Sequence, residues 1–254
     1  MSDLVEVAKK ILLENRRAGY TLPTNNKLYP AQWNWDSAFI SLGYSYFNLD
    51  YAIQELETLL KGQWDDGMVP HILFHEVDDS YFPNHTTWSC GKEIPSSGIT
   101  QPPIAASILR IIVKNNSLDE TQNKKVFNLV CKLKKYHEWF FKNRDQNQSG
   151  LISIIHPWES GYDNSPLWDF ALSKINVDKN LSYERRDLKV SNNDERPLNK
   201  DYDCYITLLN QFKSDNYNPN KLLNKSMFNI IDIGFNSIFL KANNNTNPRC
   251  ILCI

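Results

Sequence analysis

The chain has 254 residues, a formal net charge of −1, and 41% hydrophobic and 22% charged residues. This composition is typical of one large or two small globular domains, and it argues against bulk disorder and against a nucleic-acid-binding protein. No run of 18 apolar residues predicts a membrane span, and the N-terminus lacks the features of a secretory signal. The five cysteines predict no disulfide framework, and the pair Cys250 and Cys253 has no second pair at metal spacing. We therefore expect a cytoplasmic protein with no metal and no cofactor.

Apolar residues at helical spacing predict helices over 3–17, 36–46 and 51–61. Asp36 and Asp50 are expected to cap the second and the third of these helices. The long segment 63–103 contains many turn formers, which in a compact domain indicates a functional surface.

Further helices are predicted in the rest of the chain. One covers 102–116, and a capping box at Ser117–Glu120 opens the next. Others are expected over 165–176, 200–213 and 225–242, with a polar loop at 180–199 and a strand-like run at Gly150–Ile155. Paired helices separated by long aromatic loops predict an all-α fold.

The segment Tyr29–Asp36 combines two tryptophans with Gln, Asn and Asp. Aromatic rings stack on the C–H faces of sugars, and planar polar groups bind sugar hydroxyls, so this mixture suits a carbohydrate site. The alternative is a structural turn in which Trp33 and Trp35 fill the core and Asp36 caps a helix.

The segment His156–Asp169 contains three carboxylates, two tryptophans and a histidine. General acid catalysis near neutral pH needs a protonated carboxyl group, and apolar surroundings raise a carboxyl pKa by desolvation. Asp163 and Glu159 are therefore candidate acids. A polar loop locked by hydrogen bonds is the alternative.

Three weaker signals lie elsewhere. Gln101 precedes a predicted helix, and Arg196 lies near Tyr202 at the start of another; each alone is more typical of a structural role. Asp145–Gly150 resembles the start of a calcium loop, but the twelfth position is His156 where a Glu is needed. An Asx-type turn is therefore favoured there.

These motifs together carry a family resemblance. The chain resembles the bacterial and plant mannosylglycerate or glucosylglycerate hydrolases of glycoside hydrolase family 63, over about residues 10–242. The matching segments are Tyr29–Phe39, Asp65–His71, Gln101–Pro103, His156–Asp169, Arg196 with Asp201–Asp203, and Asp232–Ala242.

The resemblance implies an (α/α)6 toroid of six helical hairpins, here incomplete, and inverting hydrolysis of an α-glycosidic bond in a small glycoside. It implies that Asp163 is the general acid. The substrate-binding residues that it implies are Tyr29, Trp33, Trp35, Asp36, Gln101, Trp158, Gly161, Arg196 and Tyr202. Tyr162 and Leu167 depart from the pattern, which has Met and Arg there, and the second change removes a charge beside the site.

The resemblance also implies a second carboxylate, the general base, in a half of the toroid that this chain does not match. We expect residues 1–242 to form a partial toroid, residues 243–254 to be a non-matching tail, and the exposed half-toroid faces to self-associate. The chain alone is then expected to be inactive. The alternatives are a sugar-binding fragment without catalytic activity and a helical scaffold for protein interactions.

Overall fold

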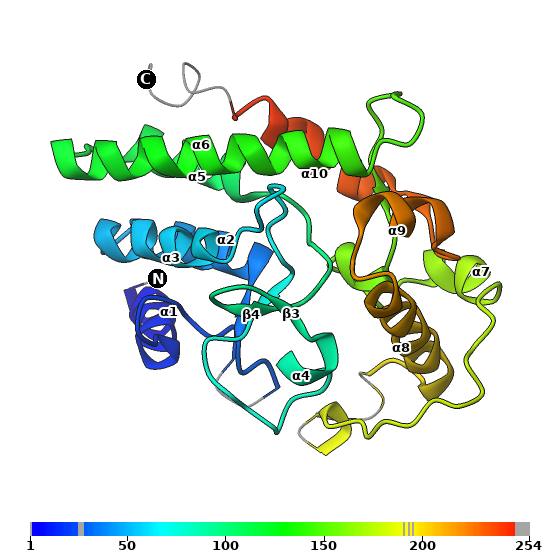
Figure 1. Ribbon diagram of the computed structural model, residues 1–254. Coiled ribbons are helices and arrows are strands. Elements are labelled where there is room, and N and C mark those ends of the chain that lie inside the picture. Colours follow the sequence, from blue (N-terminus) through cyan, green and yellow to red (C-terminus); the bar gives the residue numbers. More distant parts are fainter. Residues whose placement is uncertain (1, 25–27, 190, 193, 195, 247–254) are drawn as a thin grey trace.

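A computed structural model of the chain describes residues 2–24, 28–189, 191–192, 194 and 196–246 (Figure 1). Helices dominate it, which confirms the all-α prediction, and no helix in the described part is long and apolar enough to cross a membrane. The longer helices are α1 (Ser2–Asn15), α2 (Asn34–Ser45), α3 (Leu49–Lys61), α5 (Ala105–Asn115), α6 (Glu120–Asn143), α8 (Asn199–Ser214) and α10 (Ile233–Asn243); the short ones are α4 (His85–Trp88), α7 (Asp169–Leu172) and α9 (Pro219–Lys225).

The long helices form two adjoining rows. One row consists of α2, α5 and α10, in which α5 contacts both of the others. The other row contains α3 and α6, which contact each other. Helix α1 packs on α2. Figure 1 shows α5, α6 and α10 running alongside one another, with α8 and α9 set beside this group. Two rows of helices paired in this way form an arc of an (α/α)6 toroid, as the resemblance implies, and α1 and α10 lie at its two ends.

The α2–α3 hairpin shows why these residues form a packed pair. Ala38, Ala52, Ile53 and Leu56 are fully buried, and three of them follow the three- and four-residue spacing that places side chains on one helix face. Ser41 Oγ donates a hydrogen bond to the carbonyl of Ala52 across the hairpin, at 2.7 Å. Small residues at the contact let the two backbones approach closely.

Three predicted helix starts are wrong. Helix α3 is capped by Asn48, whose side chain accepts the amide of Tyr51, rather than by Asp50. Helix α6 is capped by Asp119 in a reciprocal capping box with Gln122, two residues after the predicted Ser117. Helix α2 begins two residues before Asp36 and has no side-chain cap, so that carboxylate belongs to the first turn. Each predicted cap lies within one helical turn of the observed boundary, where several polar residues compete.

Strands of two residues each hold the long loops in place through antiparallel pairing. The strands β1 (Gln32–Trp33), β2 (Ile72–Leu73), β4 (Pro95–Ser96) and β3 (Cys90–Gly91) form one antiparallel sheet in that order. The strand β5 (Ser153–Ile154) pairs with β6 (Ile230–Ile231), so only these two residues of the strand-like run predicted over 150–155 lie in a sheet. The segment 63–103 is thereby folded against the start of α2.

The helices predicted over 165–176 and 225–242 are also wrong in extent. The first is a 3-10 turn, Pro166–Trp168, followed by the single turn of α7. The second is helical only from Ile233 onward, as α10, because β6 pairs with β5 within the predicted span and Asp232 then accepts the amide of Phe235 to cap α10. A helical apolar period alone did not indicate this long-range strand pairing.

A buried carboxyl group in α3 makes stability depend on pH. Glu55 is fully buried and accepts hydrogen bonds from Ser37 Oγ (2.8 Å), Gln32 Nε2 (3.0 Å) and Thr21 Oγ1 (2.8 Å). Burial nevertheless raises its pKa from 4.5 to about 7. Above about pH 4.5 the unfolded carboxyl ionises freely while the folded one holds its proton, so its contribution to stability falls as pH rises to 7.

We expect Glu55→Gln to remove this dependence. Relative to Glu55→Gln, the parent protein should lose about 3 kcal/mol of unfolding free energy between pH 4.5 and 7, as measured by urea denaturation. The buried histidines, whose lowered pKa values act in the opposite direction, are common to both proteins and cancel in the difference. A constant difference across this pH range would contradict the prediction, and exposed Glu138→Gln serves as the control.

Candidate functional site

A small pocket lies where the starts of α2 and α8 meet the turn at 156–163. Six of the ten predicted site residues line it, and its enclosed volume is about 50 Å³. The lining residues are Leu28, Tyr29, Trp33, His71, Tyr81, Phe82, Trp158, Asp163, Asp187, Arg196, Pro197 and Tyr202. The structure thus brings together two parts of the chain, 28–82 and 158–202, that are far apart in the sequence.

Aromatic rings in edge-to-face contact form one wall of this pocket. The ring of Trp33 meets Tyr29 at 5.1 Å between centroids and Tyr81 at 5.5 Å, at 77° and 89°. His71 stacks on Trp158 at 6.3 Å. Edge-to-face geometry fixes the ring orientations, so the wall is pre-formed for a ligand with an apolar face.

Asp163 has the electrostatic environment that a general acid needs. Burial raises the pKa of Asp163 to about 6, against the opposing charge of Arg196 and with a further increase from the charge of Asp36. Tyr205 Oη donates a hydrogen bond to the backbone carbonyl of Asp163 at 3.0 Å, which holds this part of the turn on α8. The carboxyl group can therefore hold a proton close to neutral pH at a pocket wall.

Arg196 is held in place by a carboxylate that the sequence analysis missed. Its Nε donates to Asp187 at 2.8 Å, and its NH1 donates to Tyr29 Oη at 3.2 Å. Asp187 is buried and also binds Arg185 through Nε and NH2. Burial alone would raise the pKa of Asp187, but the two guanidinium groups outweigh it and lower that pKa. Asp187 therefore stays ionised and fixes Arg196 beside the pocket.

The other four predicted site residues lie next to the pocket rather than in its lining. Gln101 is buried, and its Oε1 accepts the backbone amide of Trp35 at 3.2 Å, which ties the segment before α5 to the first turn of α2. Burial raises the pKa of Asp36 to about 6. The Trp35 ring lies directly against Gly161.

Gly161 is required by its backbone and by its neighbour. Its φ is +80°, and a Cβ added there would lie 2.6 Å from the ring of Trp35. Gly150 offers a matched control, because its φ is +79° and nothing lies within 4 Å of an added Cβ. The two substitutions therefore share the backbone strain and differ in the clash.

We expect Gly161→Ala to destabilise the protein more than Gly150→Ala does. Left-handed backbone costs about 1–2 kcal/mol in both variants, and overpacking against Trp35 adds about 1–3 kcal/mol in the first. Thermal or urea unfolding measures the difference. Equal losses in the two variants would show that Trp35 moves aside freely.

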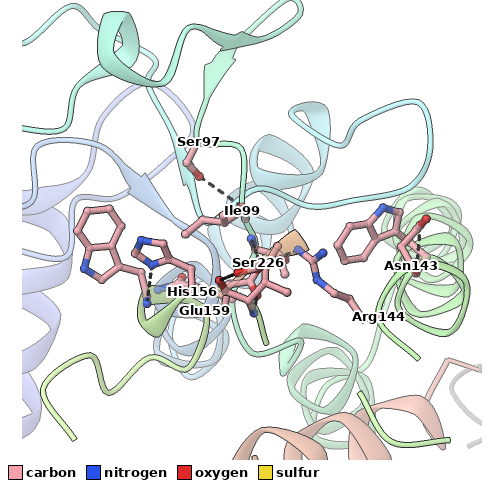
Figure 2. Close-up of polar contacts among 12 residues, drawn as sticks. Ser97, Ile99, Asn143, Arg144, His156, Glu159 and Ser226 are labelled. Carbon is pink, nitrogen blue, oxygen red and sulfur yellow. Dashed lines mark hydrogen bonds and ion pairs between the residues drawn. The ribbon is translucent and has the colours of Figure 1, made fainter. Parts of the chain in front are cut away.

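Glu159, the second candidate acid, is instead part of a buried ion pair. Figure 2 shows its carboxylate facing Arg144, whose NH2 donates to Oε1 at 2.8 Å. The amides of Ile155 and Thr100 also donate to this carboxylate, at 2.8 and 3.3 Å. Both members of the pair are 1% exposed or less, so Glu159 shapes the turn that carries Trp158 and is not open to a substrate.

The site contains residues that sequence reasoning did not single out, chiefly His71, Tyr81 and Asp187. Burial lowers the pKa of His71 to about 3, so its ring is neutral. His71 is the last residue of the matching segment Asp65–His71, so the family resemblance could have indicated it as a site residue. Tyr81 and Asp187 lie in the long loops 63–103 and 180–199, where no spacing pattern marks them.

The two departures from the family pattern have different surroundings. Tyr162 Oη donates to Asp232, the cap of α10, and its ring stacks on Trp168. Leu167 is exposed, so the charge that the pattern places there is lost from the surface of the turn. At Asp145 the predicted Asx-type turn is wrong: the carboxylate accepts the amides of Ser149 and Gly150, four and five residues on, rather than an amide two residues on.

No group of three or more His, Cys, Asp or Glu in the described part is placed to hold a metal ion. The pair Cys250 and Cys253 lies outside the described residues.

A family profile described as the mannosylglycerate hydrolase MGH1-like glycoside hydrolase domain matches residues 29–245. The chain belongs to this family. The mannosylglycerate hydrolase of Thermus thermophilus is 42% identical over 96% of this chain and 60% of its own length. Mannosylglycerate hydrolase MGH2 of Selaginella moellendorffii is 44% identical over 94% of this chain and 49% of its own length.

A solved structure supports the same membership for this MGH1-like chain. The family 63 mannosylglycerate hydrolase of Thermus thermophilus in complex with Tris and D-glycerate superposes with a TM-score of 0.93 and 42% identity. The match covers 98% of this chain and 60% of that one. The chain thus spans about half to three-fifths of the length of the curated relatives that it matches.

Proposed function

We propose that this chain supplies the general acid and the sugar-binding wall for inverting hydrolysis of a small α-glycoside, glucosylglycerate or mannosylglycerate. The observation that carries the proposal is Asp163, a carboxyl group whose pKa is raised to about 6 beside a wall of fixed aromatic rings. In this function Asp163 protonates the leaving oxygen while Trp33 and Trp158 contact the sugar ring. Relatives named as mannosylglycerate and glucosylglycerate hydrolases support the substrate class.

For the base that inversion also needs, two carboxyl groups near Asp163 come into question, those of Asp187 and Asp36. An inverting pair has its carboxyl groups roughly 6.5–9.5 Å apart, with the base ionised and open to water. Asp187 is ionised, but Arg185 and Arg196 occupy its oxygens. Asp36, whose pKa burial also raises to about 6, lies next to the pocket rather than in its lining. We therefore propose that a carboxylate outside this chain acts as base, and that the chain alone shows no turnover.

The small size of the pocket also supports a site that residues outside this chain complete. Ligand pockets commonly enclose about 300–1,000 Å³, far more than the 50 Å³ found here. A complete site then needs further walls, and about two-fifths to one-half of the relatives' own length lies outside the match. A sugar-binding role without catalysis is the second candidate, favoured by the pre-formed aromatic wall.

A chimera tests the proposal. The segment of the Thermus relative that matches this chain is replaced by the chain itself, and turnover of mannosylglycerate and glucosylglycerate is measured for both proteins. We expect turnover by the chimera and none by the chain alone above Asp163→Asn background. A folded chimera that binds substrate but never turns it over would favour the non-catalytic role, and robust turnover by the chain alone would place the base within it.

The ends of the arc expose apolar side chains that we propose drive self-association. Ile233 and Leu240 of α10 are 84% and 64% exposed, and Leu4 of α1 is 76% exposed. Apolar patches of this kind favour association in water. Light scattering should therefore detect oligomers at micromolar concentration. A monodisperse monomer would contradict the prediction.

A further inference from the structure

A second cavity, larger than the pocket that contains Asp163, lies at the opposite end of α8. Its volume is about 630 Å³, within the range of small-molecule sites and ample for one or two sugar units. Tyr202 borders the first pocket and Lys213 the second, and they are separated by roughly 16 Å along the helix. The residues that line the second cavity are Trp64, Asp65, Asp66, Ser89, Cys90, Gly91, Lys92, Lys213, Asn216 and Tyr217.

The aromatic wall of this cavity is rigid. Trp64 and Tyr217 meet edge to face, with centroids 6.2 Å apart at 82°. Trp64 Nε1 donates to Ser96 Oγ at 3.1 Å, and Tyr217 Oη donates to the carbonyl of Trp88. Gly98 makes room for this arrangement, because a Cβ there would lie 2.1 Å from the Tyr217 ring. A ligand therefore meets aromatic surfaces that need no further ordering.

The polar groups around this wall carry no net charge. Asp65 pairs with Lys92, and Asp66 accepts Trp139 Nε1 at 2.8 Å. Lys213 Nζ donates to the carbonyl of Thr87 at 3.0 Å and balances the charge of Asp66. Two carboxylates beside two ammonium groups disfavour a phosphate or another strong anion.

Uncommitted hydrogen-bonding groups complete the cavity. The side chains of Asn216 and Ser89 are exposed, and within the described residues neither side chain has a hydrogen-bond partner. An amide, a hydroxyl, carboxylates and ammonium groups can together donate to and accept from sugar hydroxyls. A purely apolar ligand would leave these groups unpaired at a cost.

We propose that this cavity is a second carbohydrate-binding site, which takes a neutral pyranoside on Trp64 and Tyr217. It lies between the turn after α3, the β3–β4 hairpin and the end of α8, away from α1 and α10 at the ends of the arc. The second site would hold a sugar unit apart from the Asp163 pocket and does not depend on the catalytic proposal.

Nuclear magnetic resonance titration of the full chain tests this inference, with methyl α-mannopyranoside, methyl α-glucopyranoside and inorganic phosphate as separate probes. We expect saturable shifts of the Trp64 indole and the Asn216 amide with a glycoside, at millimolar dissociation constants, and none with phosphate. Trp64→Ala should weaken this binding at least about tenfold. Tyr46→Ala, which truncates an exposed aromatic residue of another surface, is the matched control.

The outcomes separate the two sites. Shifts confined to the Trp158 indole would overturn the second site and leave the Asp163 pocket as the only sugar site. Shifts confined to the Trp64 indole would support the second site and count against sugar binding at the Asp163 pocket. Phosphate-induced shifts at Trp64 would identify an anion site and overturn the inference. If Trp64→Ala does not fold, the exposed variant Asn216→Ala replaces it, and glycoside affinity equal to that of the parent chain would overturn the inference.

Discussion

Replacing Arg144 with methionine should lower the free energy of unfolding by about 3–5 kcal/mol, because it leaves the buried carboxylate of Glu159 without its counter-charge. The pair is almost fully buried, at an N–O distance of 2.8 Å. Methionine keeps most of the volume of the arginine stem, so the loss reports the charge more than a cavity. Urea denaturation of the parent and variant proteins measures it.

Two further variants separate the ion pair from the shape of the site. Lys142→Met changes an exposed cation in the last turn of the same helix, α6, and should alter stability by less than about 0.5 kcal/mol. The double variant Arg144→Met, Glu159→Gln removes both charges and keeps one acceptor oxygen, which the amide of Ile155 can use, so it should recover about 1–3 kcal/mol. Additive losses in the double variant would show that the two groups do not interact.

This ion pair also shows what a sequence pattern can and cannot predict about the site. Composition and the aromatic motif indicated that the segment His156–Asp169 carries acid chemistry, but two carboxylates fitted the role equally. The family resemblance implied Asp163, and the fold supplies the physical reason, because Arg144 lies at the end of α6 and reaches Glu159 across the turn. Asp163 instead lies beside the pocket and next to Arg196. Environment, not residue type, decides which carboxyl group can act as an acid.

The helices were predicted with similar strengths and weaknesses. Long apolar periods such as those of α3 and α6 were found, since their buried face is set by residues three and four apart. The segment after α9 was not, because β6 depends on β5, which lies far earlier in the chain. Likewise Asp187 belongs to a polar loop without a period, and its role arises from contacts with two arginines.

Asp163→Asn in the chimera should lower kcat on mannosylglycerate by about 10²–10⁴-fold, the usual contribution of a general acid. Asparagine keeps the shape of the side chain and removes the proton that the leaving glycerate oxygen needs. Mannosyl fluoride has a leaving group, fluoride, that needs little protonation. The loss of kcat caused by Asp163→Asn should therefore be far smaller with this substrate. The ratio of the two losses therefore measures acid catalysis apart from binding or folding.

The pH dependence provides the second readout for the same residue. Because burial places the pKa of Asp163 near 6, kcat/KM of the parent chimera on mannosylglycerate should fall as pH rises through that value and the acid loses its proton. With the fluoride substrate this descending limb should be absent in Asp163→Asn. Asp169→Asn, which changes an exposed carboxylate of the same segment, should keep the full rate and the limb. Equal losses on both substrates would assign Asp163 a structural role, and the acid would then have to be sought among the carboxyl groups whose pKa is also raised, first of all Asp36.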